Sequence, residues 1–324
     1  MTMNTKDKTG PALKRIRKAK GMTQKVLCKE GTRNHICTIR HLRKIESGQI
    51  EPNPGMLSQL LAALGVSLPE FALQMFGEGM IQFENELEAV RNLFIEGQFD
   101  DAESRFEKLR QNEFFDSDNP RIVQSVLLIE SMMLAFRHKE YQQCLKELYK
   151  ALRITSQKIV TGGGLHYEFI ANNPLTISEY RLLMLVGTVE EILGNTATQI
   201  RILRALVTSL GNAKIDSETK GKLLPAIYFN LSNALLGESD FDGALDATNR
   251  GIAISREAKV FRAFGRLLWN KGCAHYYLDD KIAALEYFNK SFSCFTLLGY
   301  TETAEHLRKT AAEKYGIWLN YIHG

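Results

Sequence analysis

The stretch RHLRKIESGQIEPNPGMLSQLLAALGVSLPEF, residues 40–71, contains the local signals that decide the fold of the N-terminal part. Asn53 followed by proline is typical of a helix N-cap and a first helical residue, so a helix is predicted over residues 54–64. The S-x-x-E spacing at residues 67–70 is that of a capping box, which predicts a further helix over residues 68–76. Two helices so close in sequence indicate a bundle of short helices.

Three more helices are predicted upstream, over residues 11–20, 24–30 and 38–47. In the second of these, Thr23 is expected to cap the helix, and Val26 and Leu27 are expected to face inward. Five short helices within residues 1–76 predict a compact all-α domain, followed by a second domain over residues 77–324.

The helix predicted over residues 38–47 has two chemically different sides. Ile39, Leu42 and Ile45 recur at helical spacing and are expected to be buried. The outward side chains are then Arg40, His41, Arg43 and Lys44. A helix of this kind fits the major groove of DNA, where Arg or Lys pairs with guanine and neighbouring cations hold phosphates. The alternative is a solvated basic face.

Charge is unevenly distributed along the chain. Residues 1–70 carry 13 Lys and Arg against 5 Asp and Glu, a net charge of +8, whereas the remainder carries 28 against 32, a net charge of −4. A basic head on an acidic body favours a head that meets a polyanion. The sequence therefore predicts double-stranded DNA as a partner of the head.

The composition argues against several other classes of protein. The chain has 324 residues, and no apolar run approaches the roughly 20 residues that cross a bilayer. The N-terminus lacks the apolar core of a signal peptide, so a cytoplasmic protein that does not contact membranes is expected. The five cysteines are scattered without a C-x-x-C pair, which indicates reduced thiols and neither a metal site nor a disulfide framework. No nucleophile–base constellation, P-loop or dinucleotide-binding motif is present, so neither enzymatic activity nor a cofactor is expected.

Five segments of the body share one pattern of small and large residues. They are GQFDDAESRFEKL (97–109), KEYQQCLKELYKAL (139–152), GNTATQIRILRAL (194–206), SDFDGALDATNRGI (239–252) and DDKIAALEYFNKSF (279–292). All resemble the second helix of a tetratricopeptide repeat, although their spacing is longer and less regular than the roughly 34 residues of that repeat. A superhelical array of helix pairs with a concave inner wall is predicted. Residues 302–323 are expected to form a capping helix, and the glycine-rich residues 161–164 a loop joining two helices.

The first helix of each pair lines the concave wall in such arrays, so its polar residues are candidates for ligand contact. The candidates are Asn230 and Asn233 in one helix, and Arg266, Trp269, Asn270 and Tyr277, which share a face of the next. An Asn amide donates to and accepts from an extended peptide at once, Arg pairs with carboxylates, and Trp offers a flat apolar anchor. The alternative is that these residues pack between repeats.

The motifs IRKAKGMTQ, KIESG and LAALGVSLPEF occur in order within residues 11–76 and resemble the helix-turn-helix domain of the Cro/C1-repressor-like (XRE) family. The resemblance implies that Arg17 and Glu46 form an internal ion pair. It also implies DNA contacts from the second and third helices, by Gln24, Lys25, Thr38, Arg40, His41, Arg43 and Lys44. One departure is a segment about four residues longer than the family pattern, around residues 31–37.

Head and repeats together resemble the peptide-pheromone-sensing regulators of Gram-positive bacteria, the Rap/NprR/PlcR/PrgX group, and among them the PlcR-like members. The motifs TQK, KIESG, YFNLSNAL and GALDATNRGIAIS carry this resemblance. It implies a homodimeric quorum-sensing transcription regulator that binds a short linear peptide in the groove and a partly palindromic operator. Asn230 and Asn270 match positions where the group uses amide side chains, whereas residues 183–185 lack the Asn expected in the third repeat. The alternative is a repeat scaffold that binds a protein partner, with the head as a DNA tether.

Overall fold

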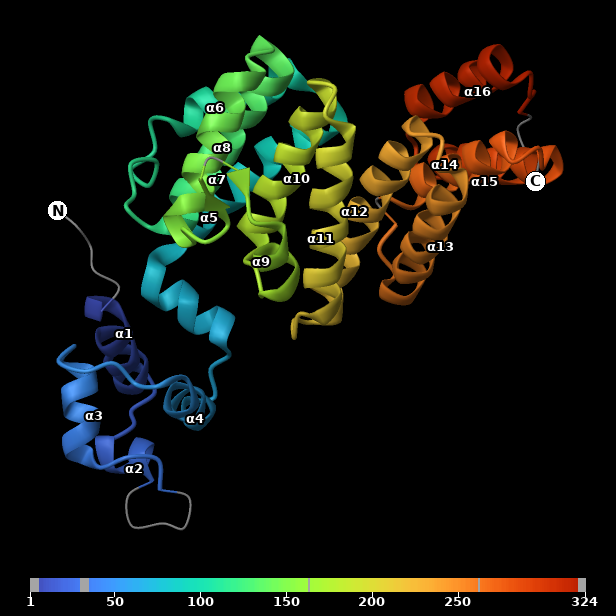
Figure 1. Cartoon of the computed structure of the whole chain (residues 1–324). Helices are drawn as coiled ribbons and strands as arrows, with labels where there is room; N and C mark the ends of the chain where they lie inside the picture. Colours follow the sequence, from blue (N-terminus) through green and yellow to red (C-terminus); the bar gives the residue numbers. More distant parts are fainter. Residues whose placement is uncertain (1–5, 30–34, 163, 262, 320–324) are drawn as a thin grey trace. The chain divides into compact units, whose positions relative to one another are not determined.

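The computed structural model describes residues 6–29, 35–162, 164–261 and 263–319. The chain divides into two compact units, Met1–Val126 and Leu127–Gly324. Almost all regular structure in the described residues is helical (Figure 1), which confirms the predicted all-α fold of a helix-turn-helix head followed by a helical repeat array. The predicted domain boundary at residues 76 and 77 falls inside a continuous helix, α5.

The helices of the first unit follow the predicted order. They are α1 (Lys6–Ala19), α2 (Gln24–Cys28), α3 (Ile39–Glu46), α4 (Pro54–Leu64), α5 (Leu68–Glu96), α6 (Phe99–Leu109) and α7 (Pro120–Met133), which continues across the division between the units. The capping box at the start of α5 is present, because the Ser67 hydroxyl accepts from the Glu70 amide and the Glu70 carboxylate accepts from the Ser67 amide.

Three details of the predicted head are wrong. Helix α1 starts at Lys6 rather than at Pro11 and accommodates the proline in its interior. Helix α5 runs 29 residues instead of ending near residue 76, because a left-handed glycine ends it only at Gly97, where φ is 80°. Val26 is 59% exposed, because α2 is so short that Leu27 and its neighbour Cys28 suffice to fill the space beneath it.

A single apolar core holds the helices of the head together. Its buried members are Ala12, Leu13, Ile16, Leu27, Cys28, Cys37, Leu42, Ile45, Leu60, Leu61, Leu64 and Phe71. Leu42 and Ile45 are fully buried, as the helical spacing predicts, and Ile39 is partly buried against the same core. Because this stripe of α3 faces inward, the basic residues between its members are turned away from the core.

The second unit consists mainly of paired helices. Its elements are the π-helix η1 (Leu134–His138), α8 (Tyr141–Thr155), β1 (Val160–Thr161), β2 (Gly164–Leu165), α9 (Tyr167–Asn172), α10 (Ile177–Ile192), α11 (Thr196–Asn212), α12 (Ser217–Gly237), α13 (Phe241–Ala258), α14 (Phe264–Tyr277), α15 (Lys281–Leu297) and α16 (Thr301–Tyr315). Helices α10/α11, α12/α13 and α14/α15 pack as pairs, and α12 also contacts α14 directly. The first helices of these two consecutive pairs therefore lie against each other, as the repeat pattern predicts.

The repeat alignment is confirmed by burial at equivalent positions. The equivalent residues are Ala102, Cys144, Gln199, Ala244 and Ala284, and each is at most 1% exposed. The expected loop at residues 161–164 is more structured than predicted, because Val160 and Thr161 pair with Leu165 and Gly164 in a short antiparallel hairpin that leads into α9. The expected capping helix ends at Tyr315, before Gly316 (φ 64°), and the predicted end at residue 323 lies outside the described residues.

In each helix pair, the second helix follows the same kind of turn. The residue two positions before it has a left-handed backbone conformation, at Gly97, Lys139, Gly194, Ser239 and Asp279, with φ between 58° and 84°. Only glycine adopts this conformation without a steric cost from Cβ. Three of these five turns therefore retain a small local strain.

We expect Ser239→Gly to stabilise the second unit by about 0.5–1 kcal/mol, because glycine removes the Cβ strain at φ 62° and this gain exceeds its extra entropy in the unfolded chain. Gly194→Ser, which introduces the same side chain at an equivalent turn, is expected to destabilise by a similar amount. Urea unfolding monitored by circular dichroism measures both changes. Equal midpoints for Ser239→Gly and the unmodified protein would contradict this account of the turns.

Candidate DNA-binding and ligand-binding sites

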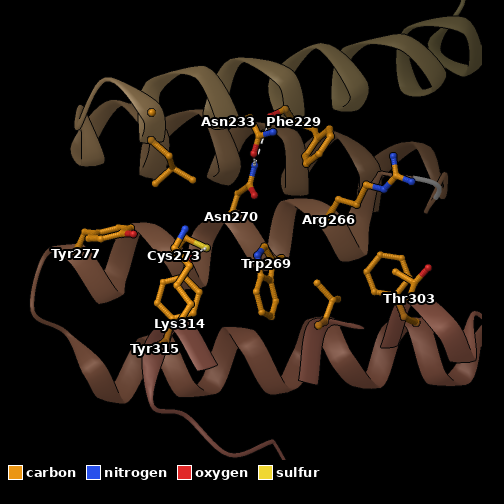
Figure 2. Close-up of a pocket in the computed structure, with 14 residues that line it drawn as sticks. Phe229, Asn233, Arg266, Trp269, Asn270, Cys273, Tyr277, Thr303, Lys314 and Tyr315 are labelled. Carbon is orange, nitrogen blue, oxygen red and sulfur yellow. Dashed lines mark hydrogen bonds between the residues drawn. The ribbon is translucent and has the colours of Figure 1, made fainter. Parts of the chain in front are cut away.

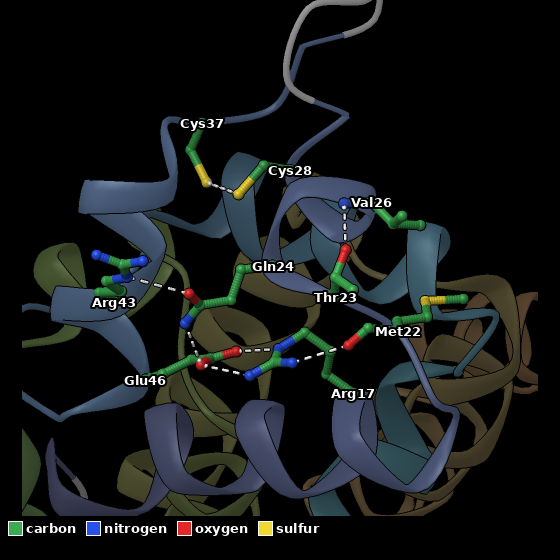
Figure 3. Close-up of polar contacts among 9 residues, drawn as sticks. All are labelled: Arg17, Met22, Thr23, Gln24, Val26, Cys28, Cys37, Arg43 and Glu46. Carbon is green, nitrogen blue, oxygen red and sulfur yellow. Dashed lines mark hydrogen bonds and ion pairs between the residues drawn. The ribbon is translucent and has the colours of Figure 1, made fainter.

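A buried ion pair ties α1 to α3 in the head (Figure 3). Arg17 Nε and Nη2 donate to the two carboxylate oxygens of Glu46 over 2.6 and 2.8 Å, and Arg17 Nη1 donates to the Met22 carbonyl over 2.8 Å. The side chains of Arg17 and Glu46 are only 9% and 3% exposed. The ion pair predicted from the sequence is therefore present, with bidentate geometry that favours a strong interaction.

Gln24 extends this network to the exposed surface of α3. Its amide nitrogen donates to Glu46 over 2.9 Å, and its amide oxygen accepts from Arg43 Nε over 3.1 Å (Figure 3). In the structure both ends of the Gln24 amide are bonded within the head, and the bond to Arg43 orients that side chain. The contact of Gln24 with DNA that the family resemblance implies stays a prediction.

The third helix presents cations outward. Arg40, Arg43 and Lys44 are exposed, whereas His41 is half-buried. Thr38 is the N-cap of α3, and its hydroxyl accepts from the His41 amide over 3.2 Å. Lys25, one residue into α2, is also exposed. Four of the seven predicted DNA contacts are thus exposed cations, and two of the remainder, Gln24 and Thr38, have bonds inside the head.

The ionisation of Glu46 links the stability of the head to pH. Burial raises the pKa of Glu46, but hydrogen bonds from Arg17 and Gln24 and the charges of Arg17 and Lys14 together hold it below its ordinary value of 4.5. A lowered pKa means that the ionised form stabilises the fold at pH values above 4.5. That stabilisation is lost as the pH falls through the folded-state pKa.

We therefore expect the head to lose protection against amide hydrogen exchange as the pH falls below about 4.5, after correction for the intrinsic exchange rate. The measurement is exchange followed by mass spectrometry on head peptides of the full chain, between about pH 7 and about pH 3. Glu46→Gln, which cannot ionise, is the control, and its protection is expected to vary less with pH. The same pH dependence in both proteins would assign the loss to other carboxylates.

Two cysteines that look scattered in the sequence lie together in the head. The Sγ atoms of Cys28 and Cys37 are 3.6 Å apart, both residues are buried, and the Ile36 amide donates to the Cys28 carbonyl over 2.9 Å. These contacts close the longer segment between α2 and α3, of which residues 30–34 lie outside the described residues. The feature of the sequence that could have indicated this contact is the nine-residue separation of Cys28 and Cys37 across a predicted turn.

A cavity of about 480 Å³ lies in the second unit between α12, α14, α15 and α16 (Figure 2). We call it the C-terminal pocket, and its lining residues are Phe229, Asn233, Leu236, Gly237, Arg266, Trp269, Asn270, Cys273, Tyr277, Phe295, Thr303, Leu307, Lys314 and Tyr315. Five of the six predicted peptide-binding residues therefore meet at one cavity. The sixth, Asn230, is half-buried on α12 and is not among the lining residues.

Asn270 links the inner helices of two consecutive repeats. It is 3% exposed, and its amide nitrogen donates to the Ser232 hydroxyl over 2.9 Å and to the Asn233 side-chain oxygen over 3.1 Å. The Ser232 hydroxyl donates in turn to the Phe229 carbonyl over 2.8 Å, so it is an acceptor for Asn270. The amide nitrogen of Asn270 therefore bonds to α12, and its amide oxygen is not bonded to that helix.

Aromatic rings form much of the wall of the C-terminal pocket. The Trp269 ring lies 4.5 Å from that of Phe288, and Tyr277 stacks on Phe241 at 4.8 Å. Cys273 Sγ and the Tyr315 hydroxyl are 3.3 Å apart. Burial raises the pKa of Cys273 to about 11 and also raises the pKa of Tyr315. Both groups are therefore neutral near pH 7.

The charged residues of the C-terminal pocket are all cationic. Arg266 lies with its guanidinium carbon 5.7 Å from the centre of the Phe229 ring, and Lys314 comes from α16. Figure 2 shows them toward opposite ends of the cavity, with Trp269 and Asn270 between them. None of the lining residues is Asp or Glu.

Helix α16 supplies the part of the pocket that the sequence did not reveal. Four lining residues come from it: Thr303, Leu307, Lys314 and Tyr315. The sequence predicted a capping helix over residues 302–323. The pattern of that segment does not indicate that the surface beneath the helix contains a cavity.

The described residues contain no group of three or more His, Cys, Asp and Glu side chains that could hold a metal ion. Within the same parts of the chain, no helix combines the length and the apolar character needed to cross a bilayer. The candidate sites described above are the basic surface of α3 and the C-terminal pocket.

Fold and sites define a class of protein, namely a helix-turn-helix head with a basic exposed third helix, followed by a helical repeat array with a pocket in its last repeats. Residues 13–71 match the helix-turn-helix family. Among curated proteins the chain has no significant sequence match.

Solved structures similar to nearly the whole chain place it in a narrower fold group. PlcR of Bacillus thuringiensis, in complex with the peptide PapR7 and DNA, has 19% identity and a TM-score of 0.70, over 93% of this chain and 99% of that chain. A cysteine-to-serine variant of the SHP pheromone receptor Rgg2 of Streptococcus dysgalactiae has 16% identity and a TM-score of 0.61, over 95% and 99%. ComR from S. thermophilus, in complex with DNA and its signalling peptide ComS, has 14% identity and a TM-score of 0.58, over 93% and 97%. The chain shares the fold of these proteins, as the resemblance predicted.

Proposed function

We propose that this chain is a DNA-binding transcription regulator controlled by a short linear signalling peptide that binds in the C-terminal pocket. The observation that carries the proposal is the presence of two sites in one chain. The exposed cations of α3 suit the DNA backbone and guanine edges, and the pocket combines amide, aromatic and cationic side chains that suit a peptide. The likeness in fold to PlcR and ComR, solved with DNA and peptides, supports it.

The regulator acts in the cytoplasm as a homodimer on a partly palindromic operator, and it binds its ligands without transforming them. Paired third helices reach successive major grooves only when they lie one DNA turn apart, about 34 Å. A peptide that binds one arrangement of the repeats more tightly shifts the population toward that arrangement. Changing the separation of the two heads in this way changes operator affinity without altering any contact to a base.

Selection of bound duplexes from a random DNA library, with and without short synthetic peptides encoded near the gene, tests this function. A palindromic site whose enrichment changes with one peptide is the expected result. Failure to enrich any site at low salt, where phosphate contacts are strongest, would overturn the DNA-binding part. An enriched site that is indifferent to every peptide would overturn the peptide control.

A scaffold that binds a protein partner, with the head as a DNA tether, is the second candidate. Exposed apolar side chains favour it, because Ile282 and Leu297 on α15 are each 86% exposed and Trp318 is 74% exposed. Ile282→Lys and Leu297→Lys would abolish capture of such a partner while leaving peptide binding intact. The C-terminal pocket favours the peptide, because it is concave and its lining is partly polar.

A further inference from the structure

The chemistry of the C-terminal pocket points to one feature of its ligand, an inference that rests on the proposed function. Arg266 and Lys314 are the charged residues of its lining, which contains no Asp or Glu. We propose that the pocket selects peptides by a carboxylate next to an apolar side chain. Arg266 or Lys314 holds the carboxylate, and the apolar side chain lies against Trp269.

The size of the cavity limits what enters it. About 480 Å³ lies within the range of roughly 300–1,000 Å³ typical of sites for small ligands. A few residues of an extended peptide fill this volume, whereas a folded protein surface does not enter it. The pocket therefore reads a short part of the peptide.

A cation beside aromatic walls favours an anionic ligand. The guanidinium of Arg266 lies over the Phe229 ring, and Lys314 Nζ lies 5.4 Å from the centre of the Tyr315 ring. A peptide that covers Lys314 displaces water from its ammonium group, and a neutral peptide leaves that loss uncompensated. A carboxylate replaces the lost water with charge-assisted hydrogen bonds, which are stronger than those between neutral groups.

The remaining polar groups suit the backbone beside that carboxylate. The Asn270 amide nitrogen is bonded to α12, so its oxygen is the atom oriented to accept from a peptide N–H. The exposed Asn233 amide is available to donate to a peptide carbonyl. Trp269 lies between the two cations (Figure 2). A short segment of a bound peptide therefore meets a hydrogen-bond acceptor, a flat apolar wall and a positive charge.

The carboxylate has two possible sources, the C-terminus of the peptide and an Asp or Glu side chain, and peptide chemistry separates them. Short synthetic peptides of random sequence are prepared as two pools, one with free C-termini and one with C-terminal amides. Each pool is offered to the full-length protein, and captured peptides are identified by mass spectrometry. Enrichment of the free-acid pool alone identifies the C-terminus, and enrichment of Asp or Glu in both pools identifies a side chain.

Single captured peptides then test the cations directly. Removing the selected carboxylate, by amidation or by Asp→Asn or Glu→Gln, is expected to weaken binding at least about tenfold. Arg266→Gln or Lys314→Gln is expected to weaken the carboxylate peptide similarly and to leave its neutral form unchanged. Arg256→Gln is a matched control, because Arg256 lies 5.7 Å over Phe264 outside the pocket. Lys309→Gln is the control on α16, where Lys309 is exposed.

Two results overturn the inference in distinguishable ways. Peptides captured equally with and without carboxylates, and bound equally by Arg266→Gln and Lys314→Gln, would refute the carboxylate selection and leave peptide binding standing. Capture of no peptide from either pool, by a protein that still selects a DNA site, would remove the proposed peptide control and this inference with it.

Discussion

Glu46→Leu is expected to destabilise the head by about 3–5 kcal/mol, because it leaves the buried guanidinium of Arg17 without its counter-charge. The same change removes the acceptor for Gln24, which then no longer orients Arg43. Hydrogen exchange of head peptides in the full chain measures the loss locally. Operator binding is expected to fall with it, since the third helix is held by these contacts.

Two comparisons separate the buried charge from other effects of the substitution. The double variant Arg17→Met/Glu46→Leu removes both charges and is expected to recover most of the lost stability. Glu218→Gln breaks the exposed pair with Lys222 and is expected to cost less than about 1 kcal/mol. A double variant as unstable as Glu46→Leu would show that packing, and not charge, dominates at this site.

The double variant Arg40→Gln/Lys44→Gln is expected to weaken operator binding about 100-fold while leaving the head folded. Both side chains are exposed on α3, so the loss falls on DNA contacts and not on the core. If both cations of each head contact phosphates, the slope of log affinity against log salt concentration decreases by about 1.8 per head, and by about 3.6 for a dimer with both heads on the operator. Fluorescence anisotropy with a labelled operator, at several salt concentrations, measures both quantities.

The matched control for that experiment is Lys220→Gln/Lys222→Gln, which removes the same number of positive charges from α12, in the second unit. Its affinity and salt slope are expected to equal those of the unmodified protein. A similar loss in both variants would mean that net charge, rather than the surface of α3, drives association. An unchanged affinity for Arg40→Gln/Lys44→Gln would identify α3 as a solvated basic face.

Local signals predicted the starts of three helices in the head at which a side chain bonds to the backbone. Thr23, Asn53 and Ser67 each cap a helix through a side-chain oxygen that accepts from an amide three residues later. The small buried positions of the repeats, such as Ala244 and Ala284, were equally visible, because close helix packing admits only small side chains there.

Features set by tertiary packing were not predictable in the same way. The exposure of Val26 depends on how few core positions α2 fills, and the contact between Cys28 and Cys37 depends on how the segment between α2 and α3 closes. In the candidate pocket, the face of α14 was predicted from helical spacing. Lys314 and Tyr315 were not, because their place in the pocket depends on how α16 packs against α15.

The position of α16 has a thermodynamic consequence for the affinity of the C-terminal pocket. This helix forms one wall of the C-terminal pocket and packs on α15. Only molecules with α16 docked offer the complete wall, so the apparent Kd for a ligand equals the intrinsic Kd divided by the docked fraction. A saturating ligand holds α16 in place in return, by about 2.7 kcal/mol at a hundredfold excess over Kd. Substitutions on the α15 side of that contact are therefore expected to tune the ligand concentration at which the pocket of the proposed regulator fills, without touching the ligand.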